Sequence, residues 1–297
     1  VNLLCDTGHI PTTISQGESM KVLYFDLEHG SQTLGGPKAL KELFGHHMLA
    51  PSTWDAFQDI LRSLYTHKEV KITKKIGPVE VKEESMKIMP KSGVEIDAFV
   101  IDTFSELSKK FQRSLVNKKT GVMKLQDWGV LKHKLDGSLD YISRIPGIVV
   151  CNCHAKLQTM DDGNNKIIPY IDGSTKEDIA KWFDFVFYTI TELSLNGEPR
   201  YFWHTGRTEK YDHAKDRTQL LPLKIPQDYQ LPIEAARKRG FEGCKILVIG
   251  SPGSGKTYAL QTLIPGTKKK LVSVDPKDLT MAETNNQVTQ TTNGVNV

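Results

Sequence analysis

The sequence predicts an α/β fold in which a mostly parallel β-sheet is covered by helices on both faces. Short runs such as residues 98–101 (AFVI) and 147–153 (GIVVCNC) are apolar at almost every position. Strands of this kind are buried on both faces, as in parallel sheets. Amphipathic stretches with helical spacing, such as residues 128–142, alternate with these strands along the chain. Sheets built in this way bind ligands at the carboxyl ends of their strands.

The elements can be assigned in chain order from their periodicity. Helices are predicted where apolar residues recur at helical spacing, and a period of two around Gly77 and Pro78 predicts an inserted β-hairpin. The hairpin spans residues 69–91, and the helices span residues 54–65, 106–115 and 128–142. Buried strands are expected at residues 21–25, 98–101, 147–153, 179–190 and 200–204, followed by a Pro-rich, then basic connector at residues 222–240.

The composition indicates an ordinary globular protein of the cytoplasm. Of the 297 residues, 38% are hydrophobic and 25% are charged. The apolar runs are strand-sized and the N-terminus lacks a basic segment followed by an apolar one, so neither a membrane span nor a secretory signal is expected. The net charge of +4 and the lysine-rich stretch at residues 109–134 do not by themselves indicate nucleic-acid binding, because such runs are more often solvated helix faces.

The four cysteines of the chain suit a reducing compartment. Cys151, Cys153 and His154 raise the alternative of a metal site, with Cys5 as a further ligand. The spacing is poor for a metal, because a C-x-C pair on a strand has no tight turn to shape the site. Buried structural thiols are the favoured interpretation.

The strongest chemical signal is a stretch that matches G-x-x-x-x-G-K-[ST] without a mismatch. An apolar strand candidate at residues 245–249 precedes it, and a helical segment that begins with Tyr258 follows it. Strand, glycine loop and helix together predict a phosphate-binding loop (P-loop). In such a loop Lys256 reaches the β- and γ-phosphates of ATP, and Thr257 supplies a hydroxyl to Mg²⁺. The residues of the loop are Gly250, Ser251, Pro252, Gly253, Ser254, Gly255, Lys256 and Thr257.

Three predicted strands end in polar residues suited to the chemistry, and these are Asp26 and Glu28, Asp102 and Thr103, and Asn152 and His154. Asp102 follows four apolar residues, as expected for the Walker B carboxylate that orients Mg²⁺ and its waters. Glu28 follows the first strand and is either the general base for an attacking water or a solvated carboxylate; Asp26 is the next candidate base. His154 follows the third strand and is either a hydrogen-bonding sensor of the γ-phosphate or a core histidine.

A pair of cations, Lys215 and Arg217, is separated by one residue. On an extended strand the two side chains would point to the same side, which suits a clamp on a phosphate. On spacing alone, a surface pair balanced by Asp212 and Asp216 is favoured.

Four segments place these residues in a longer pattern. VLYFDLEHG at residues 22–30 carries Glu28, and FVIDTFSEL at residues 99–107 carries Asp102. VVCNCHAK at residues 149–156 and AKDRT at residues 214–218 follow. Together they resemble phage-encoded RecA-like ATPases of the Sak single-strand annealing and recombination type. The resemblance covers most of residues 21–226 and the P-loop unit.

The resemblance implies roles for the site residues. Lys256 and Thr257 would bind nucleotide and Mg²⁺, Asp102 would support the metal ion, and Glu28 would be the base that activates water. His154 takes the sensor position after the third strand, where many RecA relatives have Gln.

The resemblance also implies partners. Lys215 and Arg217 fall where ring- and filament-forming relatives carry basic fingers that reach a neighbour's ATP, so a homo-oligomer is expected. Single-stranded DNA is the implied ligand, with the loop at residues 156–176 as its contact. The protein would act in the cytoplasm of a bacterial host.

The order of the motifs departs from that of the family, in which the P-loop precedes the strand that ends near the catalytic Glu (the Glu strand). Here the P-loop follows every other motif. A circular permutation accounts for this order, since the connector at residues 223–244 could span up to about 70 Å. The alternative is a P-loop that belongs to a second, truncated domain. A strand candidate at residues 270–275 follows the P-loop helix directly and competes with the strand at residues 21–26 for the same position in the sheet. The permuted interpretation predicts a single RecA-like domain at residues 1–282, with the Glu strand and Walker B at 21–226, the P-loop unit at 245–275, and a disordered tail at 283–297.

Together these expectations describe a Mg²⁺-dependent ATPase that acts on single-stranded DNA in phage recombination or strand annealing. Two alternatives stay open. One is an ATP-dependent DNA-binding and assembly module with negligible turnover, and the other is a small-molecule P-loop kinase. The kinase is less favoured, because no acceptor-binding lid with clustered arginines is evident.

Overall fold

The computed structural model describes residues 20–264, apart from residues 37, 39–47, 77, 118 and 161–162. Cys5, the strand candidate at residues 270–275 and the tail at residues 283–297 lie outside the described residues. Within them, no helix is long and apolar enough to cross a bilayer.

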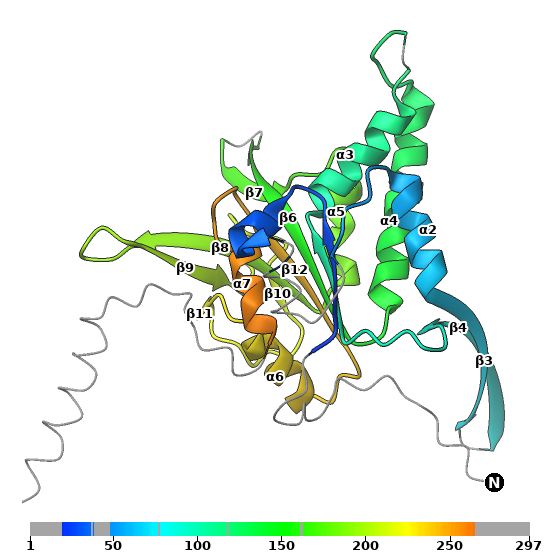
Figure 1. Cartoon of the computed structure of the whole chain (residues 1–297). Helices are drawn as coiled ribbons and strands as arrows, with labels where there is room; N and C mark the ends of the chain where they lie inside the picture. Colours follow the sequence, from blue (N-terminus) through cyan, green and yellow to red (C-terminus); the bar gives the residue numbers. More distant parts are fainter. Residues whose placement is uncertain are drawn as a thin grey trace, which may run out of the picture.

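The described residues form a central sheet, a separate β-hairpin, and helices on both faces of the sheet (Figure 1). The strands are β1 (Val22–Asp26), β2 (Met48–Leu49), β3 (Tyr65–Ile76), β4 (Val79–Pro90), β5 (Ala98–Asp102), β6 (Ile148–Thr159), β7 (Asn165–Pro169), β8 (Phe185–Leu193), β9 (Pro199–His204), β10 (Lys215–Asp216), β11 (Lys224–Pro226) and β12 (Cys244–Gly250). The α-helices are α2 (Trp54–Leu64), α3 (Phe104–Leu115), α4 (Leu125–Arg144), α5 (Thr175–Asp178), α6 (Gln230–Lys238) and α7 (Lys256–Ala259). The 3₁₀ helices are η1 (Gly30–Leu34), η2 (Ile179–Trp182) and η3 (Leu260–Leu263).

The strand order of the central sheet is β11-β9-β8-β12-β6-β5-β1-β2. Neighbouring strands from β8 to β2 run parallel, while β9 and β11 add an antiparallel edge. The P-loop strand β12 therefore lies in the middle of the sheet, although it comes last among these strands along the chain. Its register pairs Gly250 with His154, and β5 and β1 pair Asp102 with Asp26. The polar strand ends consequently meet at one edge of the sheet.

Alternating side chains of the central strands pack into two separate cores. On one face, residues such as Phe25, Phe99 and Leu247 pack against the apolar sides of α2, α3 and α4. On the other, residues such as Tyr24 and Val248 pack against α6, α7 and η3. Both faces of the strands are thus buried, which explains why their sequences are apolar without interruption. The predicted α/β class, with a mostly parallel sheet covered on both sides, is confirmed.

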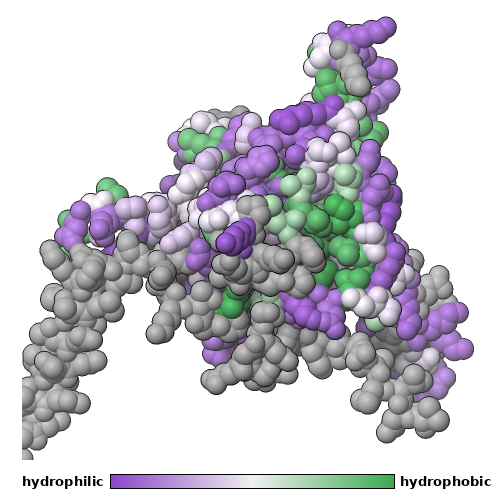
Figure 2. All heavy atoms as spheres, viewed as in Figure 1, coloured by the Kyte–Doolittle hydropathy of each residue, from purple (hydrophilic) through white to green (hydrophobic). Residues whose placement is uncertain are grey.

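The two helical layers lie on opposite sides of the sheet in Figure 1. Hydrophilic side chains cover most of the described surface on the face seen in Figure 2, and apolar side chains gather mainly in an area between β1 and α2. The hairpin β3–β4 extends away from the sheet. Its strands pair along their whole length, from Tyr65 with Pro90 to Ile76 with Val79. It begins directly after α2, earlier than the predicted residue 69.

Three further expected elements differ from the structure. The strand predicted at residues 147–153 continues as β6 to Thr159, where it pairs with β7. The strand predicted at residues 179–190 begins only at Phe185, because Ile179–Trp182 forms η2. Ile179 and Phe183 are buried one helical turn apart, and their apolar character extended the predicted strand. The predicted connector at residues 222–240 contains β11 and α6, and α6 buries Ile233 and Ala236 against the sheet.

Candidate nucleotide-binding site

The P-loop joins β12 to α7, and its glycines are required by its shape. Gly253 and Gly255 have φ angles of 74° and 85°, in the left-handed region that favours glycine. A Cβ atom on Gly250 would lie 1.9 Å from the Thr189 Oγ1 atom of β8, so only glycine fits there. The backbone N–H groups at the start of α7 have no partner within the helix, and such groups are suited to bind an anion.

Lys256 is the cation of this loop, and only 5% of it is exposed. Its Nζ atom donates to the carbonyl oxygens of Gly250, at 2.8 Å, and Ser251, at 2.9 Å. Because an ammonium group has three N–H donors, one remains for a phosphate oxygen. Burial lowers the pKa of the Lys256 amine, and the negative charge of Asp102 opposes this shift.

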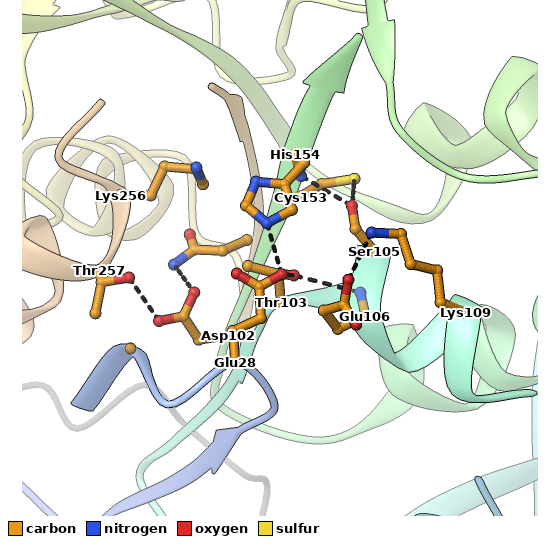
Figure 3. A network of polar contacts seen from close by, with 12 residues as sticks. Glu28, Asp102, Thr103, Ser105, Glu106, Lys109, Cys153, His154, Lys256 and Thr257 are labelled. Atoms are coloured by element: carbon orange, nitrogen blue, oxygen red, sulfur yellow. Dashed lines mark hydrogen bonds and ion pairs between the residues drawn. The ribbon is translucent and has the colours of Figure 1, made fainter. Parts of the chain in front are cut away.

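Asp102, at the end of β5, is 1% exposed and accepts hydrogen bonds from three other elements. Figure 3 shows the bond from Thr257. The donors are Tyr24 Oη at 2.7 Å, Asn152 Nδ2 at 3.0 Å and Thr257 Oγ1 at 2.7 Å. Burial raises the pKa of the Asp102 carboxyl above its ordinary value, although all three hydrogen bonds oppose the shift. The contact with Thr257 brings the predicted Walker B carboxylate to the P-loop hydroxyl.

Glu28 lies beside Asp102 at the same edge of the sheet (Figure 3). Its Oε1 atom accepts a hydrogen bond from Thr103 Oγ1 at 2.6 Å and lies 2.5 Å from His154 Nε2. Burial alone would raise the pKa of the Glu28 carboxyl, but the bonds from His154 and Thr103 outweigh it and hold the pKa below its ordinary value. Both contacts use Oε1, which leaves Oε2 for a water molecule.

Asp26, the other candidate base, has a structural role. Its two carboxylate oxygens accept from the backbone N–H groups of Gly30, at 2.8 Å, and Ser31, at 3.2 Å, and so hold the turn into η1. A Cβ atom on Gly30 would lie 3.0 Å from Asp102 Oδ2 and 3.3 Å from Thr257 Oγ1. The turn after β1 therefore packs directly against the site.

The site also contains residues to which no sequence motif assigned a role. Thr103 and Asn152 are among the polar strand-end residues that the sequence indicated, but their hydrogen bonds to Glu28 and Asp102 depend on which strands are neighbours. Tyr24 was missed altogether. The available signal was the period of two in β1, which places Tyr24 on the same side of the strand as Asp26.

Cys151 and Cys153 are buried in the core of β6, and Cys153 Sγ lies 3.2 Å from Ser105 Oγ. Burial raises the pKa of the Cys153 thiol to about 11. Among the residues that the structure describes, no group of three or more His, Cys, Asp or Glu side chains could hold a metal ion.

Lys215 and Arg217 are not brought to the P-loop of their own chain. β10 pairs with the first residues of β8, at the end of the sheet opposite the P-loop. Lys215 Nζ donates to the carbonyl oxygens of Ala180, at 3.0 Å, and Phe183, at 2.7 Å. Arg217 forms an ion pair with Asp184 at 2.8 Å. The two side chains thus have separate partners and do not form a common clamp.

The site residues fit MgATP. Thr257 and Asp102 provide oxygen ligands, or ligands to the waters, of the kind that Mg²⁺ prefers. Ser254 Oγ and His154 Nδ1 are buried and have no hydrogen-bond partner among the described residues, so polar groups remain for a ligand. A glycine loop, a buried lysine, and a buried carboxylate at the end of β5, which is separated from the P-loop strand β12 by β6 alone, define a P-loop NTPase.

Comparison with known families agrees with this class. Residues 12–218 match the model of a family described as an AAA domain, and the chain belongs to this family. Membership indicates a nucleotide-binding ATPase. The matched residues include Glu28, Asp102 and His154, whereas the P-loop lies beyond them. No curated protein and no solved structure matches the chain.

The hydrogen bond from Tyr24 predicts a pH effect. In Tyr24→Phe, Asp102 loses one of the donors that hold its pKa down, so the pKa should rise further. A Walker B role for Asp102 requires the ionised carboxylate, and the acid limb of the pH–activity profile should therefore move to higher pH. The Mg²⁺ concentration for half-maximal activity should also increase. Steady-state ATPase assays against pH and Mg²⁺ measure both.

Tyr65→Phe is the matched control, because Tyr65 is equally buried but lies at the start of the hairpin. An unchanged acid limb in Tyr24→Phe, or an equal shift in Tyr65→Phe, would contradict the proposed effect of this hydrogen bond.

Proposed function

We propose that the chain is a circularly permuted RecA-like ATPase that acts on single-stranded DNA in phage recombination or strand annealing, in the cytoplasm of a bacterial host. The observation that carries the ATPase is the convergence of Lys256, Thr257, Asp102 and Glu28 at one edge of one sheet. The permutation is supported by the place of β12 between β6 and β8, where its loop reaches the strand ends that precede it in the chain.

The chemistry follows from the positions of the side chains. Lys256 and the N–H groups of the loop bind the phosphates of ATP, while Thr257 and Asp102 would hold Mg²⁺, which neutralises developing charge. Glu28 Oε2 accepts the proton of the attacking water. Thr103 and His154 hold the carboxylate in place through its other oxygen.

A second function, nucleotide-dependent assembly on DNA with little turnover, is favoured by the state of Glu28. A carboxylate with a lowered pKa is a weaker base, and the pKa of Glu28 is held down by His154 and Thr103. Turnover would then depend on a rearrangement that releases Glu28 from His154. Steady-state ATPase rates with and without single-stranded DNA distinguish the two functions.

Two substitutions should separate binding from hydrolysis. Lys256→Ala should weaken ATP binding by about 2–5 kcal/mol, because it removes a buried cation from the phosphates. Glu28→Gln should leave ATP binding unchanged and slow hydrolysis by about 10²–10⁴-fold, because an amide cannot take the proton of water. Calorimetric binding and single-turnover hydrolysis measure these effects. Normal ATP affinity in Lys256→Ala would contradict the P-loop assignment, and a wild-type rate in Glu28→Gln would exclude Glu28 as the base.

For single-stranded DNA, the support comes from a small aromatic and basic surface near the site. The segment expected as a DNA-contacting loop includes the antiparallel pair β6–β7. Tyr170, which follows β7, is 37% exposed, and the Nζ atoms of Lys109 and Lys156 lie 4.8 and 5.6 Å from the centre of its ring. Its backbone N–H donates to the carbonyl oxygen of His154 at 2.7 Å. Exposed aromatic rings between cations suit base stacking and phosphate contact.

Tyr170→Ala should therefore weaken single-stranded DNA binding by about 1–3 kcal/mol, the usual contribution of stacking one base. Tyr170→Phe keeps the ring and should bind normally. Binding of both variants is measured by fluorescence anisotropy across a range of salt concentrations, where affinity should fall steeply as salt rises. A preference for duplex DNA, or affinity that is independent of salt, would argue against this surface.

We also propose a homo-oligomer, a ring or filament, in which the basic pair acts on the neighbouring subunit. Arg217 is better suited to this role than Lys215, because its side chain is 51% exposed while Lys215 bonds to two carbonyl oxygens. An arginine supplied by a neighbour stabilises charge in the transition state and adds little to ground-state binding.

Arg217→Ala should accordingly bind ATP normally but lose turnover. Mixing it with Lys256→Ala should restore part of the activity, because each chain supplies the group that the other lacks. ATPase assays of the mixture, with oligomeric state followed by light scattering, make the measurement. A mixture that stays inactive while both variants assemble, or a wild-type monomer that is fully active, would disprove action in trans.

A further inference from the structure

Gln227 contacts the P-loop from outside. It lies between β11 and α6, in the segment that leads back towards β12, and its side chain is partly buried. The Nε2 atom donates to the carbonyl oxygen of Ser254 at 3.0 Å and lies 3.4 Å from the carbonyl oxygen of Phe202 in β9. This one side chain therefore links the turn of the P-loop to the antiparallel edge of the sheet.

The contact with Ser254 orients a peptide group of the phosphate-binding turn. A trans peptide bond is planar, so its C=O and N–H groups point in opposite directions. By holding the Ser254 carbonyl oxygen on the outer side, Gln227 directs the N–H group of Gly255 to the side away from Gln227. Gly255 is the residue at the N-terminus of α7, where free N–H groups bind anions.

The packing around Gly255 also shows that Gln227 is in direct contact with the P-loop turn. A Cβ atom on Gly255 would lie 2.6 Å from Gln227 Oε1 and 3.4 Å from Tyr201 Cγ. Gln227 and Tyr201 thus occupy the space that a side chain would need, in addition to the positive φ angle of Gly255. The turn is in direct contact with these two residues.

We propose that Gln227 is a positioning residue for nucleotide binding: it fixes the Ser254–Gly255 peptide in the orientation that presents the Gly255 N–H group to phosphate. This role rests on the binding of ATP by the P-loop. Gln227 does not touch the reacting atoms, so it affects the affinity for nucleotide more than the rate of the chemical step.

The chain supplies a matched control in Gln230. Its Nε2 atom also donates to two backbone carbonyl oxygens, those of Thr262 and Leu263, each at 2.8 Å. These carbonyls belong to η3, at the other end of the helical segment that begins with the P-loop. Gln230→Ala therefore removes the same kind of bond from the same structural unit without touching the phosphate-binding turn.

The experiment compares the full chain with Gln227→Ala, Gln227→Glu and Gln230→Ala. Nucleotide binding is measured by calorimetry with MgATP, kcat and KM by steady-state hydrolysis, and stability by thermal unfolding. Gln227→Ala should raise the Kd about fivefold, the effect of one lost hydrogen bond, and raise KM while kcat stays within about twofold. Gln227→Glu should raise the Kd at least as much, because a carboxylate keeps the size of the side chain but cannot donate. Gln230→Ala should bind as the wild type does, even where its unfolding temperature falls as far as that of Gln227→Ala.

Two results would overturn the proposal: a Kd in Gln227→Ala within twofold of the wild type, or an equal loss of affinity in Gln230→Ala, which would indicate a general loss of stability. Failure of the wild type itself to bind nucleotide would be a different result, because it would contradict nucleotide binding by the P-loop and the role of Gln227 with it.

Discussion

The buried carboxylate of Asp102 is the interaction on which the arrangement of the site depends. A charge with almost no exposure to water is stable only when hydrogen-bond donors surround it. Here the donors come from β1, β6 and α7, through Tyr24, Asn152 and Thr257. Each of these elements has to be in place before the charge is compensated. The same set of bonds therefore stabilises the fold and aligns α7, the helix that follows the P-loop, with the end of β5.

A second balance, between burial and hydrogen bonding, sets the pKa of Glu28. Burial favours the neutral form of its carboxyl group, while His154 and Thr103 favour the ionised form and prevail. The result is a carboxylate that is ionised and well positioned but weakly basic. The backbone carbonyl oxygen of His154 also accepts a hydrogen bond from the Tyr170 N–H group, so one residue of β6 contacts both Glu28 and the segment that carries Tyr170.

Much of the fold and part of the site could be predicted from the sequence, because these signals are local. The P-loop is contiguous in sequence. Asp102 and Glu28 lie at or just after the ends of apolar strands, so their position at the carboxyl ends of strands could be inferred from each segment alone. The hydrogen-bond partners of Tyr24, Thr103 and Gln227 could not be predicted, because they depend on which strands are neighbours and in what register. The same limit applied to η2 and α6, whose apolar residues are buried in helical turns within segments that had no clear period. Lys215 shows the converse: its spacing from Arg217 favoured a surface pair and the family resemblance favoured a clamp, whereas its amine bonds to backbone carbonyls near the start of β8.

The central place of β12 has a consequence for folding. Before this strand is added, β6 and β8 each present a row of backbone N–H and C=O groups with no neighbour in the middle of the sheet. β12 pairs with strands made much earlier in synthesis, as in the contact between Leu247 and Cys151, so loops between them must close over long stretches of chain. A growing chain therefore exposes two apolar strand edges until β12 emerges, and during that interval it is open to association with other chains and suited to capture by chaperones.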